Sequence, residues 1–180
     1  MRAFIVPFSF CNLSSVERSL HDIGVDPLVL TTESIVNQTD IIILPGVGTF
    51  GQGMAFLNQS GLISLLRSHH LSKGYFLGIC LGMQLFFQSS DETKGVDGLG
   101  FIPGRVRRLI NSDFKILPHM GWNSVVVANK PKFCEINHED FLHYLQSDYY
   151  FVHNYFCDPT DQDLVCGAVH GLNRRIPVVV

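Results

Sequence analysis

A short, wholly apolar segment, Ile41-Ile42-Ile43-Leu44, ends abruptly at Pro45-Gly46. A strand with one face in water alternates apolar and polar residues, so this unbroken run predicts a strand that is buried on both faces. Parallel sheets covered by helices on both sides provide that environment. The composition agrees, because 46% of the residues are hydrophobic and only 16% are charged, against ~25% charged residues in an average soluble domain. The segment therefore favours an α/β fold.

The remaining patterns extend this interpretation along the chain. Before Asp91 we expect strands at 3–6, 28–30, 41–44 and 75–79, and helices over 13–23, 61–70 and 81–88. Beyond Asp91 we expect strands at 105–110, 122–127, 149–155 and 164–169, with one helix near 139–145. The order predicts a three-layer α/β sandwich of flavodoxin-like or Rossmann-like type, with a mostly parallel central sheet and an antiparallel extension. No linker or repeat interrupts residues 1–180, so we expect a single domain.

The charge and cysteine patterns exclude several classes of protein. The chain has 13 Lys+Arg, 16 Asp+Glu and a formal net charge of -3, which argues against a nucleic-acid partner. Residues 41–66 carry no charge, but glycines and Pro45 interrupt them, so we expect no membrane span. The five cysteines are odd in number and have no C-x-x-C spacing, which is typical of a cytoplasmic protein without a disulfide framework.

The segment Gly78-Ile79-Cys80-Leu81-Gly82 is the sharpest chemical signal. It places a nucleophile-type residue between an apolar strand and a helix, with glycines two residues before and after it, which is the pattern of a nucleophile elbow. We expect the helix N-terminus to lower the pKa of the Cys80 thiol and the Leu81 amide to face a developing oxyanion. The alternative is a buried structural cysteine, since free cysteines are often buried.

Other motifs carry weaker signals. Residues 46–51 match G-x-G-x-x-G, but no acid lies between Asp40 and Asp91 to hold a ribose, so a glycine loop facing another anion or an oxyanion is favoured over nucleotide binding. A cysteine nucleophile needs a base, and His119 and His153 lie in polar, aromatic contexts, although a structural role suits each equally. The histidines of residues 138–143 are five apart, so we predict no metal site, and no cofactor is indicated.

Five motifs, taken together, resemble one family, the glutaminase subunits of imidazole glycerol phosphate synthase, which are class I (triad-type) glutamine amidotransferases. Their order and spacing agree along nearly the whole chain. The motifs are Pro45-Gly46-Val47-Gly48, Gly78-Ile79-Cys80-Leu81-Gly82-Met83-Gln84, Gly100-Phe101-Ile102-Pro103-Gly104-Arg105-Val106, Pro118-His119-Met120-Gly121-Trp122-Asn123 and Tyr150-Phe151-Val152-His153-Asn154-Tyr155.

The resemblance implies hydrolysis of L-glutamine to glutamate and ammonia through a thioester on Cys80. The ammonia would pass to a cyclase (β/α)8-barrel partner for imidazole glycerol phosphate and histidine synthesis. By position, the oxyanion backbone would come from Val47, Gly48 and Leu81. The glutamine pocket would contain Gln84, Glu92, Tyr150, Asn154 and Tyr155. The residues facing the partner would be Asn12, His119, Trp122 and Asn123.

Two segments depart from the family pattern. The loop after the first strand reads Pro7-Phe8-Ser9-Phe10-Cys11-Asn12 and keeps only the asparagine. The family's catalytic histidine and glutamate lie in a Phe-His-Pro-Glu motif that residues 1–180 do not contain, so we expect an amidotransferase domain truncated at its C-terminal end and without its base. Two other functions stay open: a catalytically dead binding or regulatory subunit, and a glutaminase paralogue of another pathway such as surface amino-sugar synthesis.

Overall fold

The computed structural model describes residues 1–129, 145 and 147–180. They form two compact units, unit 1 (Met1–Ile102) and unit 2 (Pro103–Val180), and each is described by itself. The helix expected near 139–145 lies outside the described residues except for Leu145, which belongs to the core of unit 2. Among the described residues, no helix combines the length and the apolar character needed to cross a membrane.

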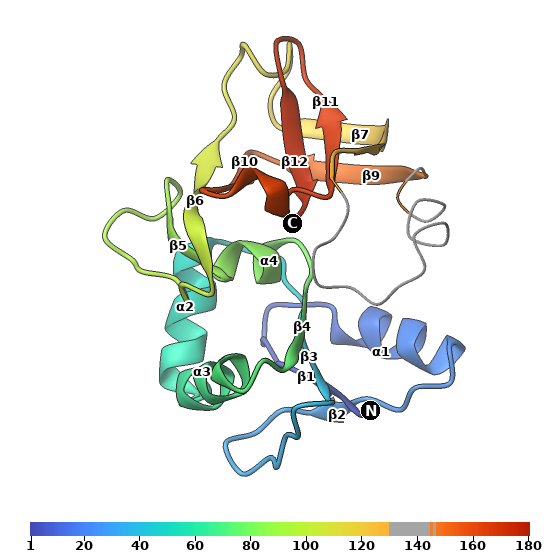
Figure 1. Ribbon diagram of the computed structural model, residues 1–180, viewed down its shortest axis with the longest axis vertical. Helices are drawn as coiled ribbons and strands as arrows, with labels where there is room; N and C mark the ends of the chain where they lie inside the picture. The colour runs from blue at the N-terminus through green and yellow to red at the C-terminus, as the bar shows by residue number, and fades with distance from the viewer. Residues whose placement is uncertain (130–144, 146) are drawn as a thin grey trace. The chain divides into compact units, whose positions relative to one another are not determined.

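Unit 1 contains a four-stranded parallel sheet in the order β2-β1-β3-β4 (Figure 1). Its strands are β1 (Ala3–Ile5), β2 (Leu28–Val29), β3 (Ile41–Leu44) and β4 (Tyr75–Gly78). Ile42, Ile43 and Leu44 are all at most 1% exposed. The central strand β3 is therefore buried on both faces, as its unbroken apolar run predicted.

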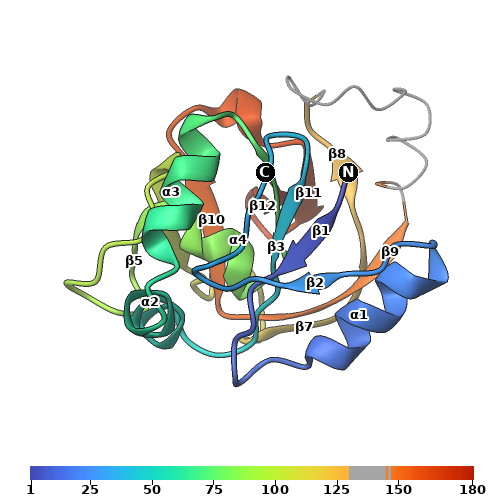
Figure 2. The ribbon, with the colours of Figure 1, turned by 90° about the horizontal axis from the view of Figure 1, so that it is seen from below.

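Helices lie on both sides of this sheet (Figures 1 and 2). Helix α1 (Leu13–Asp22) uses Leu13, Val16 and Leu20 to pack against one face of the sheet. On the other side lie α2 (Phe50–Gln59) and α3 (Ile63–Leu71), and the short α4 (Leu81–Leu85) follows β4. A parallel sheet between helices confirms the expected α/β class.

Two elements of unit 1 differ from the sequence expectation, because tertiary contacts decide them. No helix was expected over 50–59, where Gly51 and Gly53 occur, yet Thr49 and Gln52 form a capping box that starts α2. A Cβ at Gly53 would lie 2.9 Å from Leu85 Cδ1, so the glycine permits α2 to pack closely on α4. Helix α4 ends at Leu85, because its carbonyl accepts a bond from the Leu99 amide, and strand β5 (Phe87–Ser90) replaces the expected last turn.

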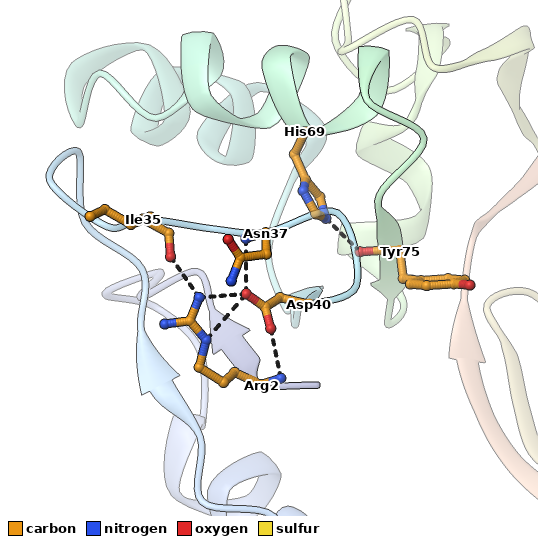
Figure 3. A network of polar contacts seen from close by, with 6 residues as sticks. All are labelled: Arg2, Ile35, Asn37, Asp40, His69 and Tyr75. Carbon is orange, nitrogen blue, oxygen red and sulfur yellow. Dashed lines mark hydrogen bonds and ion pairs between the residues drawn. The ribbon is translucent and has the colours of Figure 1, made fainter.

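A buried carboxylate at the start of β3 ties the N-terminus of unit 1 to the sheet (Figure 3). Asp40 accepts hydrogen bonds from the Arg2 amide at 2.8 Å, from Arg2 Nη2 at 2.6 Å and from the Asn37 amide at 2.9 Å. Arg2 Nη2 also donates to the Ile35 carbonyl at 2.8 Å. These bonds to the ionised form, led by those from Arg2, hold the pKa of Asp40 well below its usual range.

Unit 2 is antiparallel, as the sequence predicted. Strand β11 (Gly167–His170) pairs with both β8 (Val126–Val127) and β12 (Arg175–Val179). Strand β10 (Tyr155–Pro159) pairs with β6 (Ile102–Arg108), and β7 (His119–Ser124) pairs with β9 (Asp148–His153). A short 3-10 helix, η1 (Gln162–Leu164), precedes β11. Buried residues in these elements and in the segments between them form the core: Leu109, Val125, Leu145, Phe156, Cys166, Val169 and Ile176.

Candidate active site

Three loops of unit 1 meet at the carboxyl ends of β1, β3 and β4. The strand order reverses between β1 and β3, and open α/β sheets bind ligands beyond the carboxyl ends of their strands at such a reversal. Residues 6–12 follow β1, residues 45–49 follow β3, and Cys80 lies between β4 and α4. The topology therefore places the cysteine and the glycine loop singled out from the sequence at one edge of the sheet.

Cys80 has the strained backbone of a nucleophile elbow. Its φ of 54° and ψ of -110° lie in a region that non-glycine residues rarely adopt. A Cβ at Gly82 would lie 1.8 Å from the Leu44 carbonyl oxygen, and one at Gly78 would lie 2.6 Å from the Met83 backbone. Glycine is required at both positions because the strand-to-helix turn brings other backbone atoms this close.

Cys80 is an exposed residue, yet the pKa of its thiol is raised rather than lowered. Partial removal of water by the surrounding protein is the main cause, and the nearby Cys11 and Glu92 act in the same direction. The Leu81 amide opposes them, because its hydrogen bond lowers the pKa of the thiol. The expected effect of the helix start is therefore present, but desolvation outweighs it, and the expectation of a lowered pKa is wrong.

The loop after β3 lies against the start of α4. A Cβ at Gly46 would lie 2.6 Å from Leu81 Cβ and 2.9 Å from the Gly82 amide nitrogen. Gly48 has a φ of 107°, which side chains rarely permit, and Val47 is 56% exposed. The structure thus brings together the segments that contain Val47, Gly48 and Leu81, the residues assigned to the oxyanion site.

Cys11 also belongs to this edge, although the sequence analysis assigned it no role. Its Sγ lies 3.8 Å from the Pro45 carbonyl oxygen, and the Val47 amide donates a hydrogen bond to it. Desolvation raises the pKa of this thiol more than the Val47 amide lowers it. The position of Cys11 just after β1, whose carboxyl end lies at the strand reversal, was the signal that could have identified it.

Glu92 and Gln84, two residues expected in the glutamine pocket, lie in unit 1. Glu92 Oε2 accepts a hydrogen bond of 2.6 Å from the Phe50 amide, so its carboxylate satisfies the N-terminus of α2. The neighbouring Thr93 accepts from the Gly51 amide at 3.2 Å. Gln84 is half-buried on α4. Asn12, expected to face a partner, is exposed at the start of α1 and makes no side-chain capping bond.

The histidines of unit 1 are held in other contacts. His21 pairs with Asp26 at 2.8 Å, and His70 stacks on Phe101 with ring centroids 4.2 Å apart. His69 is buried, with Nε2 3.2 Å from the Tyr75 carbonyl oxygen (Figure 3). Within the described part of unit 1, the groups that act on the Cys80 thiol are Leu81, Cys11 and Glu92, and none of these is a general base of the histidine type.

His119 and His153, the two candidate bases, form a hydrogen-bonded chain in unit 2. His153 Nδ1 donates to the Tyr155 carbonyl oxygen at 2.8 Å, because that oxygen only accepts. His153 Nε2 is then the acceptor for His119 Nδ1 at 2.7 Å, and His119 Nε2 accepts from Asn123 Nδ2 at 2.9 Å. Burial lowers the pKa of both histidines, and for His119 the charge of a protonated His153 adds to the effect. Two neutral rings satisfy every bond in this chain.

The β7–β9 pair has two different faces. His119 is 5% exposed and stacks on Phe114 at 4.0 Å, so it lies on the buried face. Trp122 is 71% exposed, and its ring is 5.7 Å from that of Tyr150 on the opposite strand. Three of the residues expected to face a partner therefore differ in exposure. Trp122 is on the exposed face, Asn123 is half-buried, and His119 is buried.

The remaining residues expected in the glutamine pocket lie in unit 2. Tyr150 lies on the exposed face beside Trp122. The Asn154 carbonyl accepts a hydrogen bond of 2.8 Å from the Leu109 amide, and the Tyr155 carbonyl accepts the bond from His153. The structure thus describes the expected pocket in two parts, Gln84 and Glu92 in unit 1 and these three residues in unit 2.

Comparison with known proteins places the chain among glutamine amidotransferases. The family profile described as glutamine amidotransferase class-I matches residues 10–175. The imidazole glycerol phosphate synthase subunit HisH of Methanothermobacter thermautotrophicus is 35% identical over 174 residues, which cover 97% of this chain and 82% of the relative. The HisH subunit of Chlorobaculum tepidum is 39% identical over 173 residues, with coverage of 96% and 82%.

Solved structures agree on the fold. A crystal structure of a glutamine amidotransferase superposes with a TM-score of 0.68 at 13% identity, over 99% of this chain and 83% of that one. The PurLQS structure from Thermotoga maritima superposes with a TM-score of 0.63 at 15% identity, over 97% and 79%. At these identities the superpositions support the fold alone.

Proposed function

Because the chain belongs to the class-I glutamine amidotransferase family, we propose that it is a glutaminase subunit of imidazole glycerol phosphate synthase, acting in histidine biosynthesis. The observation that carries this proposal is the strained elbow at Cys80 beside the glycine loop of residues 45–49. Such an elbow presents one side chain to a substrate while neighbouring backbone amides face the same point. A structural cysteine has no need of a positive φ or of glycines on both sides.

The proposed reaction begins with attack of the Cys80 sulfur on the side-chain carboxamide carbon of L-glutamine. Amides of Val47, Gly48 and Leu81 stabilise the oxyanion, ammonia leaves, and water hydrolyses the thioester to glutamate. For glutamine binding we propose Gln84 and Glu92 of unit 1 and Tyr150, Asn154 and Tyr155 of unit 2, with residues 1–180 forming one amidotransferase domain. Because the raised pKa keeps the Cys80 thiol protonated near neutral pH, attack requires a base, and ammonia release requires a proton donor.

We propose that this base is neither a histidine of unit 1 nor His119 or His153. The groups of unit 1 that act on the Cys80 thiol include no histidine, and His119 and His153 use their ring nitrogens in the chain to Tyr155 and Asn123. The same observations favour a second candidate function, a catalytically dead subunit that binds glutamine or a synthase. The free thiols of Cys11 and Cys80 support a reducing, cytoplasmic setting for either function.

The test compares glutamate release by residues 1–180 with that by the same chain extended by a segment carrying the Phe-His-Pro-Glu pattern. Both are assayed with a saturating cyclase (β/α)8-barrel partner, and Cys80→Ser in the extended chain is the control. We expect the extended chain to exceed both others by at least about a thousandfold, since triad members act as a unit.

Two outcomes would contradict these assignments. Turnover by residues 1–180 within about tenfold of the extended chain, a difference of ~1.4 kcal/mol, would show that a residue within the chain supplies the base. Partner binding by both chains without glutamate release by either would favour the catalytically dead subunit.

A further inference from the structure

A second thiol lies at the same loop cluster as the proposed nucleophile. Cys11 Sγ contacts the Pro45 carbonyl oxygen at 3.8 Å and accepts the Val47 amide bond. Between these two residues, Gly46 packs directly on Leu81, with only 2.6 Å between the position of a Cβ on Gly46 and Leu81 Cβ. Leu81 follows Cys80 in the chain, so one three-residue loop touches Cys11 on one side and the elbow on the other.

The two thiols differ from the other described cysteines in access and in electrostatic coupling. Cys80 is exposed and Cys11 is half-buried, whereas Cys157 and Cys166 are buried in unit 2. The charge of an ionised Cys11 also acts to raise the pKa of Cys80.

We propose that Cys11 is a resolving thiol for Cys80, so that a hydroperoxide converts the pair into a reversible disulfide. In the first step the Cys80 thiol gives up its proton, its sulfur attacks a peroxide oxygen, and an S–O bond forms as the O–O bond breaks. The released hydroxide takes up that proton and leaves as water. Cys80 sulfur is oxidised by two electrons to the sulfenic acid, and the peroxide is reduced. In the second step Cys11 attacks that sulfur, an S–S bond replaces the S–O bond, and the proton of Cys11 leaves with hydroxide as a second water.

The consequence of this reaction rests on the proposed function, because a disulfide on the nucleophile stops glutamine hydrolysis until a thiol reduces it. The bond itself does not rest on that function, since it requires only the two sulfurs and the oxidant. A readout of the bond therefore separates failure of this inference from failure of the glutaminase assignment. The disulfide also protects Cys80, because a sulfenic acid without a resolving thiol proceeds to the irreversible sulfinic and sulfonic acids.

The experiment treats the reduced chain with hydrogen peroxide and maps its tryptic peptides by mass spectrometry without reduction. Cleavage after Arg2, Arg18, Lys73 and Lys94 leaves Cys11 alone in peptide 3–18 and Cys80 alone in peptide 74–94, whereas the other three cysteines share peptide 133–174. We expect a disulfide between 3–18 and 74–94 that dithiothreitol removes completely. In Cys11→Ser, whose hydroxyl can keep a bond to the Pro45 carbonyl, we expect dithiothreitol-resistant sulfinic acid on peptide 74–94 instead.

Circular dichroism of both proteins checks that the Cys11→Ser chain is folded, and Cys11→Ala is the second variant if it is not. The inference is overturned if peptide 74–94 links to 133–174, or if no 3–18 to 74–94 disulfide forms while Cys80 is oxidised. Equal amounts of irreversible Cys80 oxidation in the wild-type and Cys11→Ser chains would overturn it as well.

Discussion

At the scale of single residues, the site depends on how closely backbone segments approach Cys80. Gly46, Gly78 and Gly82 each lie where a Cβ would meet another segment at less than 3 Å. The positive φ of Cys80 persists because these contacts hold the turn on both sides. The glycines of this region therefore serve close packing around a strained cysteine, and their replacement should affect stability before it affects chemistry.

Gly82→Ala should lower the free energy of unfolding by about 3 kcal/mol, because its Cβ would lie 1.8 Å from the Leu44 carbonyl oxygen and the backbone would have to shift. Gly24→Ala is the matched control, since Gly24 has a φ of 75° with no atom within 4 Å of its Cβ position. The control should cost only about 1 kcal/mol from backbone strain. Urea unfolding measures both, and equal losses would contradict the close approach at Gly82.

At the scale of elements, the β7–β9 pair joins a buried polar chain to an exposed apolar face. His119 and Asn123 on β7 and His153 on β9 form the chain, while Met120, Trp122, Tyr150 and Val152 project from the other face at 55–71% exposure. The two faces share the same strands in fixed register, with Trp122 opposite Tyr150. We therefore expect the protonation state of the histidine chain to affect the stability of these two strands.

The stability of unit 2 should fall as the pH falls below about 6.5, the usual pKa of histidine in an unfolded chain. The folded pKa values of His119 and His153 are lowered, so the unfolded state binds more protons in this range, and a proton on either ring sets two N–H groups against each other. His119→Gln should flatten this dependence, whereas His170→Gln, at an exposed position, should leave it unchanged. Urea unfolding across a pH series provides the measurement, and an unaltered slope in His119→Gln would contradict the assignment.

At the scale of the whole molecule, the proposed partner surface and the Cys80 elbow belong to different units. The exposed face of β7–β9 belongs to unit 2, and the Cys80 elbow belongs to unit 1. An exposed tryptophan beside a tyrosine on a strand pair is typical of the aromatic anchors that carry most of the energy of a protein interface. Loss of binding and loss of thiol reactivity should therefore be separable.

Trp122→Ala should weaken association with a cyclase barrel by about 2 kcal/mol, because the pocket on the partner would lose the indole that fills it. Leu172→Ala removes another exposed apolar side chain of unit 2, 62% exposed, and should leave affinity unchanged. Titration calorimetry measures both affinities, and labelling of Cys80 by a glutamine-like electrophile should be equal in the two variants. Unchanged affinity in Trp122→Ala would place the interface elsewhere.

The sequence by itself determined the parts of this protein that depend on local pattern. The apolar run of residues 41–44 predicted a doubly buried strand, and β3 is one. The glycines around Cys80 predicted a strained turn between a strand and a helix, and the backbone angles show it. Both succeed because hydrophobic periodicity and the steric limits of the turn are properties of neighbouring residues.

Only the tertiary structure decided the features that depend on distant atoms. Helix α2 contains Gly51 and Gly53, which weaken any local helix signal, but Gly53 permits close packing on Leu85 and Gly51 close packing on Thr93. The pKa of Cys80 is raised because desolvation by surrounding segments exceeds the effect of the adjacent Leu81 amide. His119 is buried against Phe114 and bonded to His153, residues 34 apart in sequence, and Cys11 meets the loop at Pro45 only after β1 and β3 pair. In each case burial or contact across the fold sets the property, and no spacing along the chain encodes it.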